Sequence, residues 1–230
     1  MANAGFSAPV NYWGSIDGLT PKSSNDGKNS SVAEAPDEYG DTAAHDEYGE
    51  VLAPSTEYAV TGEVDLSDIE LGSIHTVGTG AAAKKLMLTT VVINTQAGTP
   101  PTVSISGVEV ESTATAKRTY ALTGTLKPRS KAQDVCGAFT ASTNFTQIST
   151  TAQVDPHVDT VKGVPVNSDA SHGRIEVQAT MTDPTGSGTI TAAANGGFTV
   201  TASPAETNPD ANYITRAATA TKYLAGTEAA

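Results

Sequence analysis

Residues that commonly carry out catalysis or bind metals are few in this chain of 230 residues. A catalytic site needs a positioned base or nucleophile in a cleft. The four histidines each stand beside glycine, proline, serine or acidic residues, and none is spaced as in a zinc motif. They are His45, His75, His157 and His172. We therefore expect structural or solvated roles for all four, and no metal-binding residue among them.

The single cysteine, Cys136, lies between Val135 and Gly137. A small thiol in such a context is more often buried than reactive. One cysteine also excludes an internal disulfide, which fits assembly in a reducing cytoplasm. The sequence contains no P-loop, dinucleotide-binding fingerprint or GxSxG elbow. We therefore predict no catalytic residue and no cofactor, and we expect that the protein is not an enzyme.

A local repeat is the most conspicuous motif: Asp37-Glu38-Tyr39-Gly40 recurs as Asp46-Glu47-Tyr48-Gly49. Clustered carboxylates could hold Ca²⁺, but their spacing does not match an EF-hand loop. The favoured interpretation is a duplicated turn whose tyrosines dock on a neighbour while the acidic side chains stay in water.

Charge is distributed unevenly along the chain. Residues 1–75 hold 14 acidic residues and two lysines, a net charge of −12, whereas residues 76–230 hold 11 acidic and 11 basic residues and are neutral. Such a chain lacks the basic patch that grips DNA. An acidic surface repels nucleic acid, although an acidic segment that only aids solubility is the simpler interpretation.

The composition favours β-structure. Only 5% of residues are aromatic, and threonine, alanine, serine, glycine and valine are abundant, which suits thin sheets with small side chains. The N-terminus lacks the basic start and apolar run of a signal peptide, and no stretch is long and apolar enough to span a membrane.

The elements divide the chain into an extended, polar, acidic arm at 1–57 and a β domain at 58–230. The arm has neither helical nor strand periodicity, so we expect another surface to order it, either its own β domain or a neighbouring subunit. Alternating patterns and glycine turns predict antiparallel strands in the β domain. The predicted strands are 58–66, 86–94, 102–111 with a bulge or bend at Gly107, 118–126, 145–154, 174–182, 188–192, 197–203 and 212–219.

One short helix is expected at about 130–136. Ser130 and Gln133 match a capping box, and Gly137 follows where a C-terminal glycine belongs. The predicted fold is therefore mainly β, an antiparallel β-sandwich or partly closed barrel with one short helix and a long extended N-terminal arm.

In overall profile the chain resembles bacteriophage virion proteins, and most of all tail tube (major tail) proteins. The shared traits are size, acidic balance, a β-sandwich rich in threonine, alanine and valine with one short helix, and the long arm. The resemblance is best placed over residues 58–219, where TYALTGTLKPRSKAQDVCGAF is similar to their strand-then-helix passage. The resemblance transfers no site residue.

This resemblance implies a structural subunit of a virion, assembled in the host cytoplasm. Copies would form stacked rings, hexameric in that family, that contact other virion proteins and conduct DNA as non-specific cargo. Ring closure would also pair the strand edges that are otherwise exposed. Two alternatives remain open: a capsid decoration or head-fibre protein, and a carbohydrate- or receptor-binding β-sandwich module.

Overall fold

The structure is a computed structural model. It describes residues 11–29, 32–36, 42–47, 51–78, 83–140, 145–161, 164–183, 190–193, 196–202, 206–208 and 213–228. The DEYG repeat at 37–40, the second copy from Tyr48 to Gly49, and the predicted turn at 185–188 lie outside these residues.

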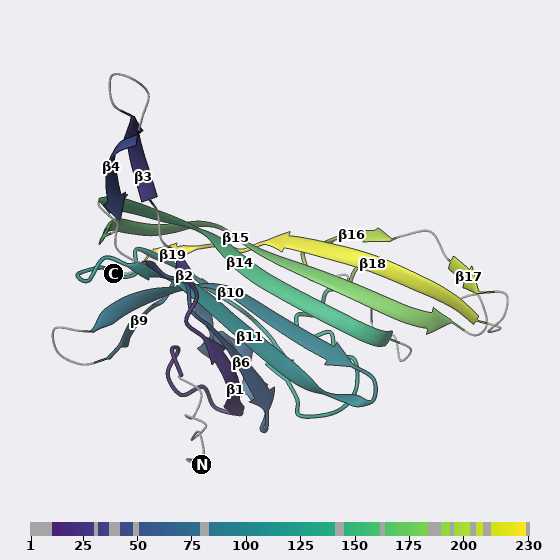
Figure 1. The fold of residues 1–230 in the computed structure, drawn as a ribbon. Coiled ribbons are helices and arrows are strands. Elements are labelled where there is room, and N and C mark those ends of the chain that lie inside the picture. Colours follow the sequence, from purple (N-terminus) through teal and green to yellow (C-terminus); the bar gives the residue numbers. More distant parts are fainter. Residues whose placement is uncertain are drawn as a thin grey trace, which may run out of the picture.

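A ten-stranded antiparallel sheet dominates the fold (Figure 1). Eight strands follow one another across it, β9 pairs with β10 at one end, and β17 pairs with β18 at the other side. In spatial order the strands are β1 (Leu19–Asn25), β6 (Ser55–Val60), β11 (Thr99–Val110), β10 (Lys84–Gln96), β14 (Phe145–Val161), β15 (Val164–Asp183), β18 (Tyr213–Tyr223) and β16 (Thr199–Ala202), with β9 (Ile74–Val77) and β17 (Glu206–Asn208) alongside.

Shorter elements pack against one face of this sheet. They include a three-stranded sheet, a two-stranded sheet and one 3₁₀ helix; two further strand pairs lie in the N-terminal part of the chain. The covering elements are β8 (Glu70–Leu71), β12 (Arg118–Ala121), β19 (Thr227–Glu228), β7 (Val64–Asp65), β13 (Thr125–Leu126) and η1 (Leu66–Asp68). The N-terminal pairs are β2 (Lys28–Asn29) with β5 (Val51–Leu52), and β3 (Val32–Pro36) with β4 (Thr42–Glu47). The prediction of a mainly β, antiparallel fold is confirmed, and the layering is consistent with a β-sandwich.

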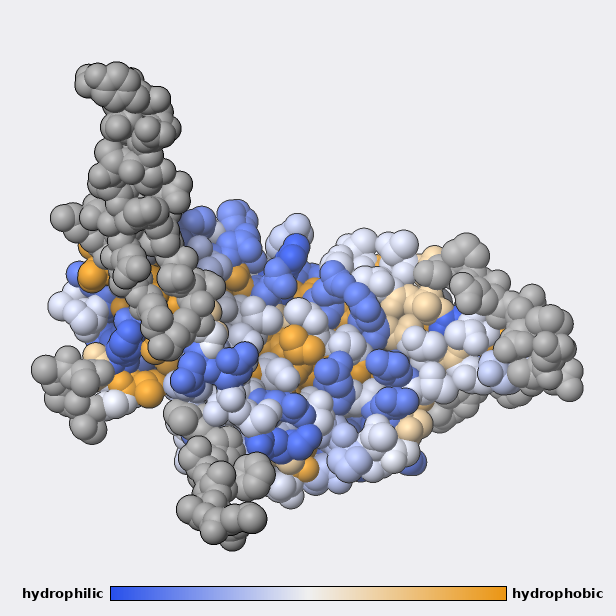
Figure 2. All heavy atoms as spheres, in the orientation of Figure 1, coloured by the Kyte–Doolittle hydropathy of each residue, from blue (hydrophilic) through white to orange (hydrophobic). Residues whose placement is uncertain are grey.

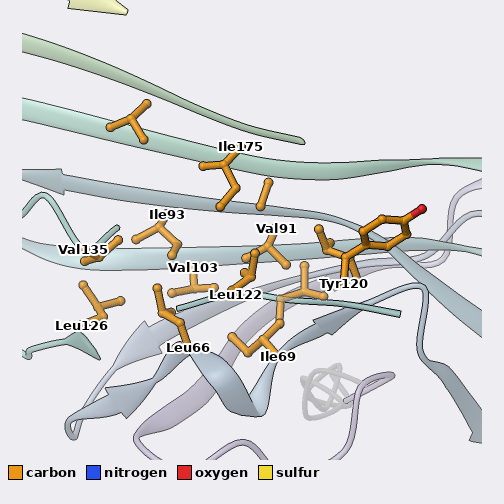
Figure 3. Close-up of a cluster of buried hydrophobic side chains, with 14 of the residues drawn as sticks. Leu66, Ile69, Val91, Ile93, Val103, Tyr120, Leu122, Leu126, Val135 and Ile175 are labelled. Atoms are coloured by element: carbon orange, nitrogen blue, oxygen red, sulfur yellow. The ribbon is translucent and has the colours of Figure 1, made fainter. Parts of the chain in front are cut away.

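The core lies between the large sheet and these short elements (Figure 3). Val91, Ile93 and Ile175 come from the sheet, and Leu66 and Leu122 face them from the opposite layer. All are at most 2% exposed. Burying such side chains drives folding, and truncating one to alanine typically costs about 2–5 kcal/mol.

The predicted helix at 130–136 is wrong, because these residues form a loop. The side chain of Gln133 turns back onto the chain: its Nε2 donates to Lys127 O at 2.8 Å, and its Oε1 accepts from Lys127 N at 3.1 Å. Gln133 N in turn donates to Thr95 Oγ1 at 2.8 Å. The Gln133 side chain thus satisfies both backbone groups of Lys127, and Thr95 on β10 satisfies the Gln133 N–H, so the loop is held by these bonds rather than by helical ones.

Part of the expected arm belongs to the core. Trp13 is 2% exposed, and β1 pairs with β6 in the large sheet. Tyr58 Oη donates to Asn11 Oδ1 at 2.7 Å, which ties the start of the described chain to β6. The expected boundary at residue 58 therefore falls inside β6 rather than between an arm and a core.

Two of the predicted strands are interrupted. The 58–66 strand ends at Val60 and resumes briefly in β7, and the 118–126 strand divides into β12 and β13 at Gly124. Gly124 has φ +125°, and a Cβ there would overlap Val135 O, so the chain turns at the one residue that fits.

The strand pairing is irregular at Gly107, as expected, but the extra residue of the bulge lies on the partner strand β10. The pairing of β10 with β11 shifts between Leu88 and Thr90, opposite Gly107. A Cβ on Gly107 would overlap the Trp13 ring, so this glycine lets the arm pack flat on β11. Of the predicted 188–192 strand, the described part forms only an isolated bridge between Phe139 and Ala192.

Candidate functional site

Among the described residues, no element packs over the second face of the large sheet, and this open face carries mainly hydroxyl and amide side chains. The strand register aligns them in rows across eight strands. One row contains Ser23, Glu57, Ser104, Val92, Thr151, Glu176, Thr221 and Thr199; the next contains Thr20, Ala59, Thr102, Asn94, Ser149, Gln178, Thr219 and Thr201. Only two of these sixteen residues are charged, so the acidity of the chain is not concentrated here. Figure 2 shows mostly white and blue residues over these strands.

The two edges of this sheet differ chemically. β1 contains Pro21 and Lys22, and its register shifts between Pro21 and Ser23. Proline, a charge and a bulge all oppose the addition of another strand. β16, with the sequence TVTA, has none of these features. Among the described strands, the β16 edge is therefore the one better suited to pairing with another chain.

The β14–β15 hairpin extends beyond the sheet as a two-stranded ribbon. β18 pairs with β15 only over 174–183, and β10 pairs with β14 only over 147–153. Past these positions β14 and β15 continue to pair with each other up to Val161 and Val164. Val164 is 60% exposed and Val166 is 44% exposed, so apolar side chains face water near the end of the ribbon. Exposed apolar groups at a projecting end are typical of contact surfaces.

A cluster of polar side chains stands at the base of this ribbon. Ser171 Oγ lies 2.6 Å from His157 Nε2 and 2.8 Å from His172 Nδ1, and His172 Nδ1 lies 3.6 Å from Asp155 Oδ2. A serine beside a histidine and a carboxylate could in principle act as a nucleophile. Here the carboxylate is beyond hydrogen-bond distance of the imidazole, and both side chains are more than half exposed. The cluster is better explained by hydrogen bonding at the bulge, where His172 has φ +52°.

An open cleft of about 520 Å³ lies beside the cluster. His172, Arg118, Tyr223 and Glu228 line it, and Tyr120 forms its floor. The Arg118 guanidinium lies 3.5 Å from the Glu228 carboxylate, and the two side chains are 44% and 83% exposed. Such an exposed pair contributes little to stability.

A second cleft, of about 360 Å³, is formed by the loop that replaces the predicted helix. Lys127 and Arg129 line it together with Phe139 and Phe145, whose ring centroids are 5.8 Å apart. Asp134 also lines it; its Oδ2 accepts from Phe139 N at 2.7 Å, while its Oδ1 is buried without a hydrogen-bond partner. This cleft thus combines positive charge, aromatic surface and an unsatisfied acceptor.

Cys136 adjoins this cleft as a free, largely buried thiol. Burial, and to a smaller extent the nearby Asp134 carboxylate, raises the pKa of Cys136 to about 12. The thiol therefore stays protonated at neutral pH and is a poor nucleophile.

The remaining sequence candidates are dispersed. His45 lies in β4, and His75 lies in β9, where its ring meets Trp13 edge to face at 5.7 Å. Burial lowers the pKa of His75. Within the described ranges, no group of three or more histidine, cysteine or acidic side chains could hold a metal ion.

Two features of the site were not expected from the sequence: the pairing of His157 with His172 through Ser171, and the basic aromatic cleft. A run of three basic residues in KPRSK, residues 127–131, was the available signal for the cleft.

In the part of the chain that the structure describes, no helix is long and apolar enough to cross a membrane. No family model matches the chain, and no curated protein matches it.

Proposed function

We propose that this protein is a self-assembling structural subunit, a virion protein of the tail-tube kind whose copies form stacked rings around a channel for DNA. The observation that carries the proposal is the large sheet: within the described residues it is packed on one face only, and its β16 edge has none of the features that protect the β1 edge. An exposed edge of this kind is a hazard for a protein that works alone, whereas pairing it with a neighbouring copy removes the hazard.

The open face suits the inner wall of such a ring. DNA binding depends on lysine and arginine side chains that neutralise phosphates, and the two central rows contain none. Serine, threonine, asparagine and glutamine keep the face hydrated without attracting DNA electrostatically.

Imaging of the purified full-length protein tests this proposal. Negative-stain microscopy and sedimentation velocity over a range of concentrations should reveal rings or stacked tubes. Closed caps or fibres would favour the capsid decoration or head-fibre alternative. Monomers that persist at the highest soluble concentration would refute self-assembly.

A second candidate is a carbohydrate- or receptor-binding module, and the 520 Å³ cleft favours it. Tyr223 is 78% exposed at the rim of this cleft, where a sugar ring could stack, and Arg118 and Glu228 could hydrogen-bond its hydroxyl groups. A glycan array probed with wild-type protein and with Tyr223→Ala would test it. Binding that is lost in the variant would support this function over assembly.

A further inference from the structure

We propose that the 360 Å³ basic aromatic cleft binds the Asp-Glu-Tyr-Gly repeats of a second copy of this chain. The inference deepens the proposed function, on which it rests, because it assigns one contact between neighbouring copies.

The cleft has the chemistry that an acidic, tyrosine-bearing segment requires. The Arg129 side chain has no ion pair in the described structure, and Lys127 makes only an exposed contact of 3.4 Å with Glu63. The half-buried Phe145 provides aromatic surface beside these cations, and the buried Phe139 packs behind it with a ring-centroid distance of 5.8 Å. Aromatic rings attract one another in tilted or edge-to-face arrangements, so a tyrosine ring fits beside them while its acidic neighbours face the cations.

The chain itself carries the matching segment. Residues 30–50 contain seven acidic residues and no lysine or arginine, and both tyrosines in this stretch follow directly after an Asp-Glu pair. The loop at 127–131 contains three basic residues and no acidic one. In a chain with a net charge of −12, this is the densest basic stretch, so charge complementarity pairs the two segments.

The geometry favours a contact between copies over a contact within one copy. The 30–50 segment leaves the β domain at Leu52, whose N–H bonds to Glu109 near the end of β11. The cleft loop is attached at the other end of that strand, where Gly98 N donates to Ser130 O. With about 3.3 Å per residue, β11 separates the two points by roughly 35 Å.

Figure 1 agrees with this separation: β3 and β4 rise at one end of the molecule, and the β10–β11 turn lies at the other. Because the acidic segment and the cleft lie at opposite ends of one copy, the segment of one copy meets the cleft of the next in a head-to-tail contact. Repetition of such a contact stacks copies in a line.

Charge reversal tests the inference with the full-length chain. The double variant Lys127→Glu/Arg129→Glu should weaken head-to-tail association by about tenfold or more, since each tenfold corresponds to about 1.4 kcal/mol. Adding the reversals Asp46→Lys/Glu47→Lys to the same chain should restore association. The single variant Arg129→Glu is compared with Lys117→Glu, an exposed charge reversal outside the cleft that changes the net charge by the same amount, and circular dichroism verifies folding of each variant.

A synthetic peptide with the sequence AAHDEYGEV provides an independent measurement. It should bind the wild-type protein and compete with assembly, and binding should weaken as sodium chloride is raised, because exposed charges are screened beyond about 10 Å at 0.1 M. The same peptide with tyrosine replaced by alanine should bind more weakly, as should the double variant with the original peptide.

The outcomes separate this inference from the proposed function. Wild-type protein that assembles, together with a Lys127→Glu/Arg129→Glu variant that assembles equally well, would overturn the cleft contact and leave the structural role standing. Monomeric wild-type protein that still binds the peptide at the cleft would overturn the structural role alone. Absence of peptide binding at low salt would overturn the inference directly.

Discussion

Trp13 and Gly107 depend on each other. The tryptophan ring lies against the glycine on β11, in a place where any Cβ would overlap both the ring and Met87 O. We predict that Gly107→Ala lowers the free energy of unfolding by about 1–3 kcal/mol, as overpacking of a core does. Trp13 is the sole tryptophan and is buried, so its fluorescence in urea titrations reports the loss directly.

Ser104→Ala on the same strand is the matched control for this substitution. Its side chain lies on the open face, so the change should stay within about 0.5 kcal/mol. Equal stability of the Gly107→Ala variant and the wild type would show that Trp13 does not pack against β11 in solution.

Tyr12 and Tyr58 predict a loss of stability at alkaline pH. Burial, the largest cause for each, raises both pKa values to about 12 from the usual 10.0. Well below pH 10 the hydroxyl groups are protonated in both the folded and the unfolded state, so the free energy of unfolding does not depend on them. Between pH 10 and pH 12 the unfolded state releases its protons first, so the free energy of unfolding should fall.

Urea titrations at several alkaline pH values, with ultraviolet titration of the seven tyrosines, measure this effect. The Tyr58→Phe variant should show a shallower decline, because one of the two late-titrating hydroxyl groups is gone. Ionisation of all tyrosines together near pH 10 would contradict the buried positions.

At the level of elements, the loop at 127–139 depends on Gln133 rather than on a helix cap. Gln133→Ala removes the bonds to both backbone groups of Lys127 inside the protein, and we expect a loss of about 2–3 kcal/mol. Ser130→Ala should be nearly neutral, whereas a capping serine would cost about 1 kcal/mol. Thermal and urea unfolding of the two variants measures both losses. A larger loss for Ser130→Ala than for Gln133→Ala would support the predicted helix instead.

The strands could be predicted where one face is apolar and the other polar. The alternation of Ile175, Val177 and Ala179 predicted β15 because those side chains face the core. The ribbon beyond it was missed, since Val164 and Val166 alternate there without being buried, and a sequence does not show what a strand packs against.

The failed helix and the packing of Trp13 into the core share a physical cause. Ser130 and Gln133 have the spacing of a capping box. In the fold, however, the Gln133 side chain bonds to the backbone of Lys127, and the Gln133 N–H donates to Thr95 on another strand. Trp13 lies in a segment without strand or helix periodicity, so only the shape of β11 at Gly107 reveals its site. The cleft could be predicted only as a run of basic residues, because its aromatic wall comes from Phe139 and Phe145 on separate segments.

For the molecule as a whole, the segment at 30–50 can be separated from the fold. β2 and β5 pair directly before and after it, with Asn29 opposite Val51, so a short glycine-serine turn can join them. We predict that this replacement leaves thermal stability nearly unchanged and abolishes stacking, as seen by sedimentation velocity. Stacks of normal length from the replaced chain would remove the segment from the assembly.

The position of the open face within an assembly can be measured by cysteine labelling. The native Cys136 should react little with maleimides, because its buried thiol has a pKa of about 12. Gln178→Cys should react with both a small and a large maleimide in the monomer, and only with the small reagent in assembled particles. Ser112→Cys, in the loop after β11, is a comparison site outside the face. Full reaction of the assembled Gln178→Cys particles with the large reagent would mean that this face points outward.

The separation of the acidic segment and the basic cleft by the length of β11 gives any stack a direction, with one end that presents clefts and another that presents acidic segments. The chain with residues 30–50 replaced keeps the cleft and has nothing to offer the next copy. It is therefore expected to act as a chain terminator: added in small amounts to the wild type, it would shorten the stacks in proportion to its share while leaving the rate of new stack formation intact.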